Sequence, residues 1–136
     1  MSPRTQNPPD NPQRLREWRD AIEELIDQIT RWCNELDWLV ERKEGKVLHE
    51  DLTGEYSVPV LWIQTPRGRV IVEPVALYLV GVEGRVDIYA WPSLAKVILV
   101  DFDQGWRILT EDRVELDQPW SREVFEQVVK GLTVPA

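Results

Sequence analysis

The residues best suited to chemistry lie in the stretch GRVDIYAWPSLAKVILVDFDQGW, positions 84–106. Its polar candidates are Asp87, Ser93, Lys96, Asp101 and Asp103. Ser93 and Lys96 match the S-x-x-K pattern of serine acylases, in which both side chains share one face of a helix. Here the pair falls between two predicted strands, and neither S-D-N nor K-T-G occurs, so we interpret the match as chance.

The remaining catalytic and metal patterns are also incomplete. Asp101-Phe102-Asp103 resembles a D-x-D site for Mg²⁺, but aspartates beside a glycine-containing hairpin tip commonly bond their own backbone. His49 is the single histidine and Cys33 the single cysteine, so the chain offers no multi-histidine or zinc site. The patterns therefore predict no metal site.

Nuclease and nucleotide-binding patterns are missing as well. The Glu-x-Lys pairs, Glu41 to Lys43 and Glu44 to Lys46, fall at the predicted end of a helix, not on strands beside the acids of the sheet. Isolated turn glycines form neither a G-x-G-x-x-G nor a Walker loop. We therefore expect no cofactor, and no enzyme activity from a recognisable catalytic set.

Length and charge narrow the class of protein. The chain has 136 residues, 43% of them hydrophobic, and a formal net charge of −8. This suits a single soluble domain with its own core. The negative charge argues against direct nucleic-acid binding, which needs a basic stripe. No apolar run reaches the roughly 20 residues of a membrane span, and a single cysteine suits a reducing compartment, so we expect a cytoplasmic protein.

An apolar stripe at helical spacing dominates the first third of the chain. It comprises Leu15, Trp18, Ile22, Leu25, Ile29, Trp32, Leu36 and Leu39, widened by Ile26, Cys33 and Val40. With Asn11 as N-cap, Pro12 at the first turn and Gly45 as the stop, the pattern predicts a helix from Pro12 to Glu44. The broad stripe favours packing on a sheet, while a dimerising coiled-coil seam remains an alternative.

Strand-like segments follow from Lys46 onward. They are KVLHEDL, YSVPVLWIQT, RVIVEPVALYLV, RVDIYAW, AKVILVDF and WRILT, separated by the turns DLTGE, TPRG, GVEG, WPS and DQG. These short turns predict antiparallel pairing of about six strands. Pro59 indicates an edge or a bulge, and Pro74 a bend. Asp87, Tyr89 and Trp91 alternate with Val86, Ile88 and Ala90, so the two sets should face opposite sides of the sheet.

A short helix is predicted at the end of the chain. Ser121 is its N-cap, Trp120 should staple to Phe125, and Gly131 should end it. The predicted fold is therefore α+β: a Pro-rich disordered arm (residues 1–10), then one domain (11–136) with a long helix on an antiparallel sheet and a short C-terminal helix.

Seven tryptophans are the unusual feature of the composition. Tryptophan is enriched at binding hot spots, and several strands are apolar on both faces. We therefore predict a non-enzymatic protein-binding module of the inhibitor, immunity, chaperone or accessory-subunit type. Its apolar surface, rimmed by acids, would carry Trp38, Asp87, Tyr89 and Trp91 and would meet a second protein, such as a basic one that the acids would steer, or a second copy.

The alternative is a small-molecule or hydrolytic pocket in a curved sheet. Asp87, Tyr89 and Trp91 would line it. The two hypotheses share these three residues and differ in whether they form a surface or a cavity.

Overall fold

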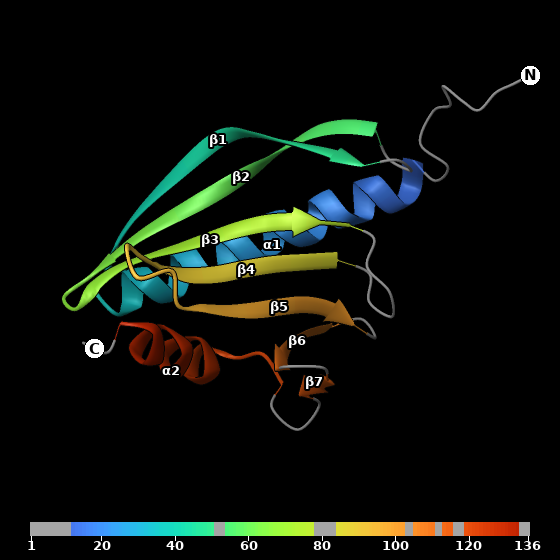
Figure 1. Ribbon diagram of the computed structural model, residues 1–136. Helices are drawn as coiled ribbons and strands as arrows, with labels where there is room; N and C mark the ends of the chain where they lie inside the picture. Colours follow the sequence, from blue (N-terminus) through green and yellow to red (C-terminus); the bar gives the residue numbers. More distant parts are fainter. Residues whose placement is uncertain are drawn as a thin grey trace, which may run out of the picture.

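The residues that the structure describes form two helices and an antiparallel sheet whose strands follow one another in chain order (Figure 1). A computed structural model describes residues 12–50, 54–77, 84–102, 105–110, 113–115 and 119–133. The predicted arm (residues 1–10), the proposed cap Asn11 and the candidate ligand Asp103 lie outside these residues. Within the described residues the sheet has seven strands, β1 to β7 in spatial order. The predicted α+β class is confirmed.

The first helix, α1 (Pro12–Glu35), buries the predicted apolar stripe against its own sheet. Its buried residues are Trp18, Ile22, Leu25, Ile26, Ile29 and Cys33, each at most 2% exposed. Ile26 and Cys33 are among them, which explains why the stripe is wider than a coiled-coil seam. A dimer through this stripe would require these side chains to leave the core, so the sheet-packing interpretation is confirmed.

The predicted end of this helix at Glu44 is wrong. Asp37 adopts a left-handed conformation with φ of 60°. The amide of Trp38 donates to the Cys33 carbonyl at 2.9 Å, and the amide of Asp37 to the Asn34 carbonyl at 3.2 Å. This is a Schellman motif, which ends a helix and usually uses glycine at the position of Asp37. The apolar periodicity continued through Leu39 and concealed the stop.

The residues after this stop form the edge strand β1 (Leu39–Glu50), which pairs with β2 (Gly54–Thr65). Gly45, predicted as the helix stop, instead lies in a bulge of β1, where the register shifts between Lys43 and Lys46. Its φ of 91° is a conformation that glycine adopts without strain. Pro59 lies opposite this bulge, as proline in a strand predicts.

The sheet continues through β3 (Gly68–Ala76), β4 (Gly84–Trp91), β5 (Lys96–Phe102), β6 (Gly105–Thr110) and the short β7 (Arg113–Glu115). The register shifts between Pro74 and Ala76 in β3, which confirms the irregularity predicted at Pro74. β2 pairs with β3 only from Leu61 to Thr65, and the other half of the β1–β2 hairpin diverges from β3 (Figure 1).

The second helix, α2 (Arg122–Leu132), begins as predicted. The Ser121 side chain accepts from the Val124 amide at 3.2 Å, and the Trp120 ring lies 5.9 Å from that of Phe125. The cap and the hydrophobic staple are therefore both confirmed. The predicted stop is one residue early, because the helix passes through Gly131 and ends at Leu132.

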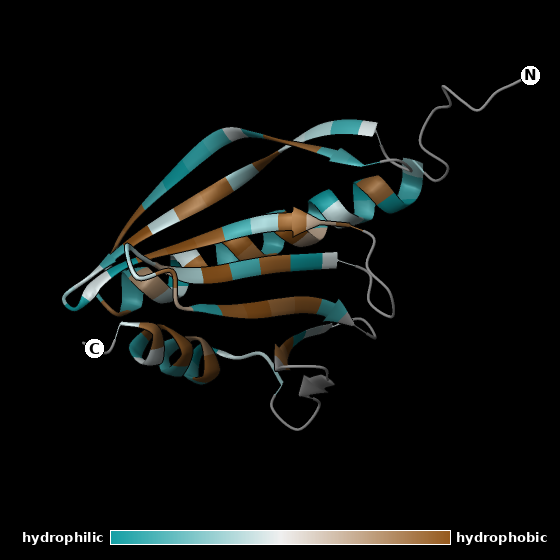
Figure 2. Cartoon of the chain, viewed as in Figure 1, coloured by the Kyte–Doolittle hydropathy of each residue, from teal (hydrophilic) through white to brown (hydrophobic). Residues whose placement is uncertain are grey.

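Both helices contribute to one core with a single face of the sheet. Phe125 from α2 is fully buried and lies 5.7 Å from the Trp32 ring of α1. Gly84 allows Trp18 to approach β4, since a Cβ there would lie 2.3 Å from the indole ring. Figure 2 shows bands of alternating hydropathy along β3 and β4, the pattern of strands with two different faces.

Candidate functional site

The face of the sheet that the helices do not cover, which we call the open face, is defined by the strand register. One row across it consists of Glu41, Trp62, Ile71, Tyr89 and Lys96, and the next of Leu39, Gln64, Arg69 and Trp91. Their neighbours along the strands, such as Ile63, Val70 and Ile88, belong to the core. Because side chains alternate along a strand, the two rows point away from the helices.

Asp87 occupies the centre of the open face and is held by two cations. The Arg85 guanidinium donates to its two carboxylate oxygens at 2.8 and 3.1 Å, and Lys96 Nζ lies 3.4 Å from Oδ2. The residue is only 7% exposed. Both oxygens of the carboxylate are therefore in contact with a cation, which is what a buried charge requires.

Glu73, directly across from Asp87 on β3, forms a second network. The Tyr89 hydroxyl donates to Glu73 Oε1 at 2.6 Å, and Lys46 Nζ donates to Oε2 at 2.5 Å and to the Pro74 carbonyl at 2.7 Å. Burial opposes ionisation of Glu73, but the bonds from Lys46 and Tyr89 outweigh it and hold its pKa below the ordinary value. Burial and the Glu73 carboxylate raise the pKa of Tyr89 to about 12.

These protonation states define the chemistry of the Glu73 network. Near neutral pH Glu73 is an anion that accepts two hydrogen bonds, and Tyr89 is a neutral phenol that donates one. A general acid or base works best with a pKa near the operating pH. Here the pKa of Glu73 is lowered and that of Tyr89 is raised, so both move away from neutral pH. The arrangement therefore suits fixing the shape of the open face better than transferring protons.

The end of the open face nearest the β2–β3 turn is different, because it exposes apolar surface. Leu39 is 74% and Trp91 52% exposed, at the two ends of one row. In the neighbouring row Trp62 is flanked by Lys43 Nζ, 4.8 Å from its ring centre, and by the Arg69 guanidinium at 5.1 Å. We call Leu39, Trp62, Gln64, Arg69 and Trp91 the tryptophan strip. A cavity of about 200 Å³ lies between Leu39, Trp62 and Arg69.

The predicted site residues divide between three environments. Asp87 and Tyr89 lie in the charged centre of the open face, and Trp91 lies in the tryptophan strip. Trp38 is only 8% exposed, and its ring lies 6.1 Å from Phe125 in the core under the helices. The expected surface containing both Trp38 and Trp91 is therefore wrong for Trp38, which the Schellman turn directs inward.

Sequence reasoning missed Leu39, Trp62 and Arg69. Leu39 was assigned to the helix stripe, which ends before it. Trp62 and Gln64 alternate with the core residues Leu61 and Ile63, and this period of two is a signal that could have placed Trp62 on the outer face. Nothing local in the sequence indicates that Arg69 from the next strand lies over the Trp62 ring.

The expected acidic rim is not what borders the strip. Lys43 and Lys96 are exposed on neighbouring strands, Arg67 is exposed in the turn that joins β2 to β3, and Arg69 belongs to the strip. Glu41, the acid beside Trp62 on β1, is paired with Lys43 at 3.2 Å. The charges next to Trp62 and Trp91 are therefore mostly positive, although the chain as a whole is acidic.

The other residues considered for chemistry are placed as follows. The Ser93 hydroxyl accepts from the Ala95 amide in the β4–β5 turn, and Lys96 is bound to Asp87, so the two do not share a helix face. His49 and Glu55 form an exposed pair at 3.4 Å. Cys33 is fully buried, as predicted for a thiol on the core stripe, and burial raises its pKa to about 12.

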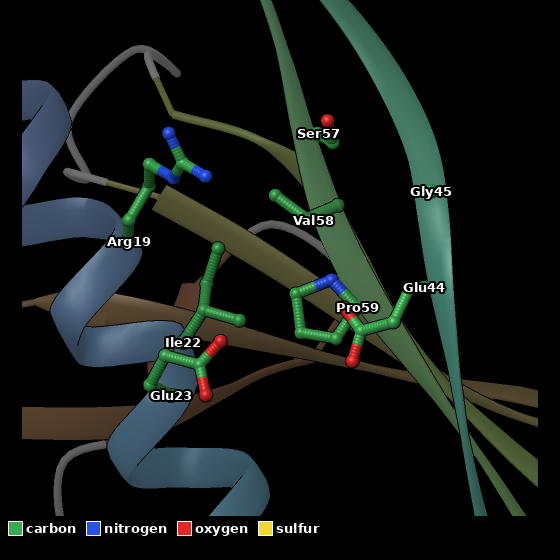
Figure 3. Close-up of a pocket in the computed structure, with 8 residues that line it drawn as sticks. All are labelled: Arg19, Ile22, Glu23, Glu44, Gly45, Ser57, Val58 and Pro59. Carbon is green, nitrogen blue, oxygen red and sulfur yellow. The ribbon is translucent and has the colours of Figure 1, made fainter.

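A larger cavity, of about 330 Å³, lies between α1 and the bulge of the β1–β2 hairpin (Figure 3). Its lining includes the apolar residues Ile22, Val58 and Pro59 and the polar residues Arg19 and Ser57. Glu23 and Glu44 both bind Arg42, and this triad bridges helix and hairpin beside the cavity. Hydrogen bonding to Arg42 lowers the pKa of Glu23. None of the predicted site residues lines this cavity.

Comparison with models of protein families, with curated proteins and with solved structures finds no match to this chain. Across the parts of the chain described above, no group of three or more His, Cys, Asp or Glu residues is arranged to hold a metal ion. Neither of the two helices seen there is long and apolar enough to cross a membrane.

Proposed function

We propose that this protein is a protein-binding module that meets its partner through the tryptophan strip. The observation that carries the proposal is the exposure of Leu39 and Trp91 in one row of the open face, with Trp62 in the neighbouring row. Exposed tryptophan beside arginine is the composition of interface hot spots. The inhibitor, immunity, chaperone and accessory-subunit roles all require such a surface.

The rigidity of the strip supports the same proposal. Its residues project from four adjacent paired strands, and the Trp62 ring is held between two cations. The networks of Asp87 and Glu73 fix the neighbouring part of the face. A surface ordered before binding loses little entropy when a partner docks.

The hydrolytic or small-molecule alternative at Asp87, Tyr89 and Trp91 has less support. The Asp87 carboxylate is bound by Arg85 and Lys96, and Tyr89 by Glu73. A catalytic role for Asp87 would require these contacts to exchange for contacts with a substrate. The proposal also places the protein in the cytoplasm, supported by its single, buried thiol.

Site-specific photo-crosslinking in the native host tests the proposal. A photoreactive phenylalanine analogue replaces Trp91, Leu39 or, as the control on the exposed side of α1, Arg31. We expect the same protein in adducts from positions 91 and 39, and no such adduct from position 31. Calorimetric titration of the purified partner should then show at least about a tenfold loss of affinity for Trp91→Ala, as at a hot spot.

Three results would contradict the proposal. Adducts from position 31 alone would place the interface on the helix, and adducts containing only a second copy of this chain would mean that the strip mediates self-association. The third is a partner that binds Trp91→Ala as tightly as the wild-type chain.

A further inference from the structure

The charges of this protein are unevenly distributed, and the tryptophan strip lies in a basic region. The chain has a net charge of −8. Strand alternation and register nevertheless place more cations than acids on the open face: Lys43, Arg69, Arg85, Lys96 and Arg107 against Glu41, Glu73 and Asp87. The local field at a binding site acts on a partner more strongly than distant, screened charges do.

The cations of the open face differ in whether they already have a carboxylate partner. Arg85 is bound to Asp87, and Lys46 reaches Glu73 from β1. Arg69 lies over Trp62, and Arg67 is exposed in the turn between β2 and β3; neither makes an ion pair with any described residue. The donors of both guanidinium groups are therefore available, those of Arg69 within the strip and those of Arg67 in the adjoining turn. Guanidinium binds carboxylate in a planar, two-pronged geometry.

The dimensions of the strip suit a short extended segment. Leu39, Gln64, Arg69 and Trp91 stand on four neighbouring strands, so the row spans roughly 14 Å at the ordinary strand spacing of about 4.8 Å. Alternate side chains of an extended peptide lie about 7 Å apart. Three of them could therefore contact the row, with apolar side chains at Leu39 and Trp91 and a carboxylate at Arg69.

We infer that the strip binds an acidic segment of its partner, in which carboxylates bind Arg69 and Arg67 and an apolar or aromatic side chain packs on Trp91. This inference rests on the proposed function and reverses the sign of the partner expected from the net charge. A single-stranded nucleic acid is less suited, because Glu41, Glu73 and Asp87 share the face and the whole chain repels a polyanion. A short acidic peptide avoids most of that repulsion.

Selection from a random peptide library tests the inference directly. Random dodecapeptides displayed on phage are selected on the immobilised full chain, and enriched sequences are synthesised with a fluorescent label. We expect enriched peptides to be net negative and to contain a large apolar residue. Arg69→Glu should weaken their binding about tenfold or more by fluorescence anisotropy, and high salt should weaken it as well.

Two further variants accompany the charge reversal at Arg69, one as a control and one as a second test. Arg31→Glu makes the same charge change on the exposed side of α1 and should weaken binding by less than about twofold, since it acts only through long-range, screened repulsion. Arg67→Glu changes an exposed turn side chain and should weaken binding in the same direction as Arg69→Glu, which guards against misfolding of either variant. Circular dichroism confirms that each variant is folded.

The outcomes separate this inference from the proposed function. Enriched peptides that are neutral or basic but lose binding with Trp91→Ala would overturn the inference and leave the proposed function standing. Failure to enrich any peptide that depends on Trp91 or Leu39 would count against both. Equal or tighter binding of labelled oligothymidylate, weakened by Arg69→Glu, would replace the acidic segment with a nucleic acid and overturn the inference.

Discussion

The two faces of the sheet differ in the groups that shield their apolar side chains from solvent. Under the helices, side chains such as Leu61, Ile88 and Leu99 are fully buried by other apolar groups. On the open face, Ile71 and Val100 are also buried, although no helix covers them. Long side chains of the same face, including Tyr89 and Arg85, stand beside them in the register and cover them.

This difference shows that a sheet face without a helix is not necessarily an unfilled interface. Strands that are apolar on both sides predict either a surface that meets a partner or a curved sheet around a pocket. The ion networks of Asp87 and Glu73 instead cover the centre of the open face. Among the described residues the exposed large hydrophobic side chains are Leu39, Val47, Trp91 and Leu94, and the tryptophan strip brings Leu39 and Trp91 into one row, which gives a partner a defined target.

The largest effect should come from the helix-covered face. Phe125→Ala removes a fully buried ring that contacts Trp32, Trp38 and Trp120, and we expect a loss of about 3–5 kcal/mol of unfolding free energy. Urea denaturation followed by tryptophan fluorescence measures it. A loss below about 1 kcal/mol would mean that α2 contributes little to the core.

Gly84→Ala should have the next largest effect. Its added methyl group would lie 2.3 Å from the Trp18 ring, so either the ring or β4 must move, at a cost of about 1–3 kcal/mol. The matched control is Gly131→Ala in α2, where a Cβ meets nothing within 4 Å and helix propensity improves. Thermal unfolding of both variants should shift in opposite directions, and equal shifts would contradict the close approach of Trp18.

Asp87→Asn tests the charged centre of the open face. The change preserves shape but removes the charge that Arg85 and Lys96 contact, and we expect a loss of about 1–2 kcal/mol. Glu24→Gln on the exposed side of α1 serves as the control and should leave the urea midpoint unchanged. If Asp87→Asn also leaves the urea midpoint unchanged, the stability of the protein does not depend on the ion network of the open face.

The pH dependence of the unfolding free energy should also report on Glu73 and Tyr89 of the open face. Because Glu73 has a folded pKa below its ordinary 4.5, it stabilises the fold above that pH, and this stability is lost as pH falls through the folded pKa. Tyr89 has a pKa raised from 10.0 to about 12, so its contribution is complete below pH 10 and is lost as pH rises toward 12.

Urea midpoints measured across the pH range check both effects, the loss of stability at acid pH (the acid limb) and the loss at alkaline pH. Glu73→Gln should flatten the acid limb, and it should also lower the pKa of Tyr89 by removing the neighbouring charge. The absorbance of tyrosinate, compared with a Tyr89→Phe variant, reports the second effect. An acid limb that Glu73→Gln leaves as steep as in the wild type would assign the acid sensitivity to other carboxylates.

The smallest effect on stability should come from the tryptophan strip. Trp91→Ala removes an aromatic ring that is half exposed, and we expect a change within about 0.5 kcal/mol. Compared with Phe125→Ala in the same urea series, it contrasts an aromatic residue that supports the fold with one that is available for binding. A destabilisation as large as that of Phe125→Ala would show that Trp91 supports the fold.

Local sequence patterns alone determined most of the architecture. Periods of 3.6 and 2 predicted α1, the strands and the burial of Cys33, while Ser121 and Trp120 predicted the start of α2, because these signals depend only on near neighbours in the chain. The end of α1 was missed for the same reason. Asp37 can adopt the left-handed conformation but does so less readily than glycine, so its sequence signal is weak.

The tertiary structure alone decided which residues form the binding surface and what charge it carries. The sequence predicts both Trp38 and Trp91 on the binding surface, yet Trp38 lies in the core and Trp91 on the open face. Lys43, Arg69 and Lys96 come from three separate strands, and only the strand register brings them to one face. Net charge sums every residue regardless of position, whereas a partner responds to the charges that face it at short range.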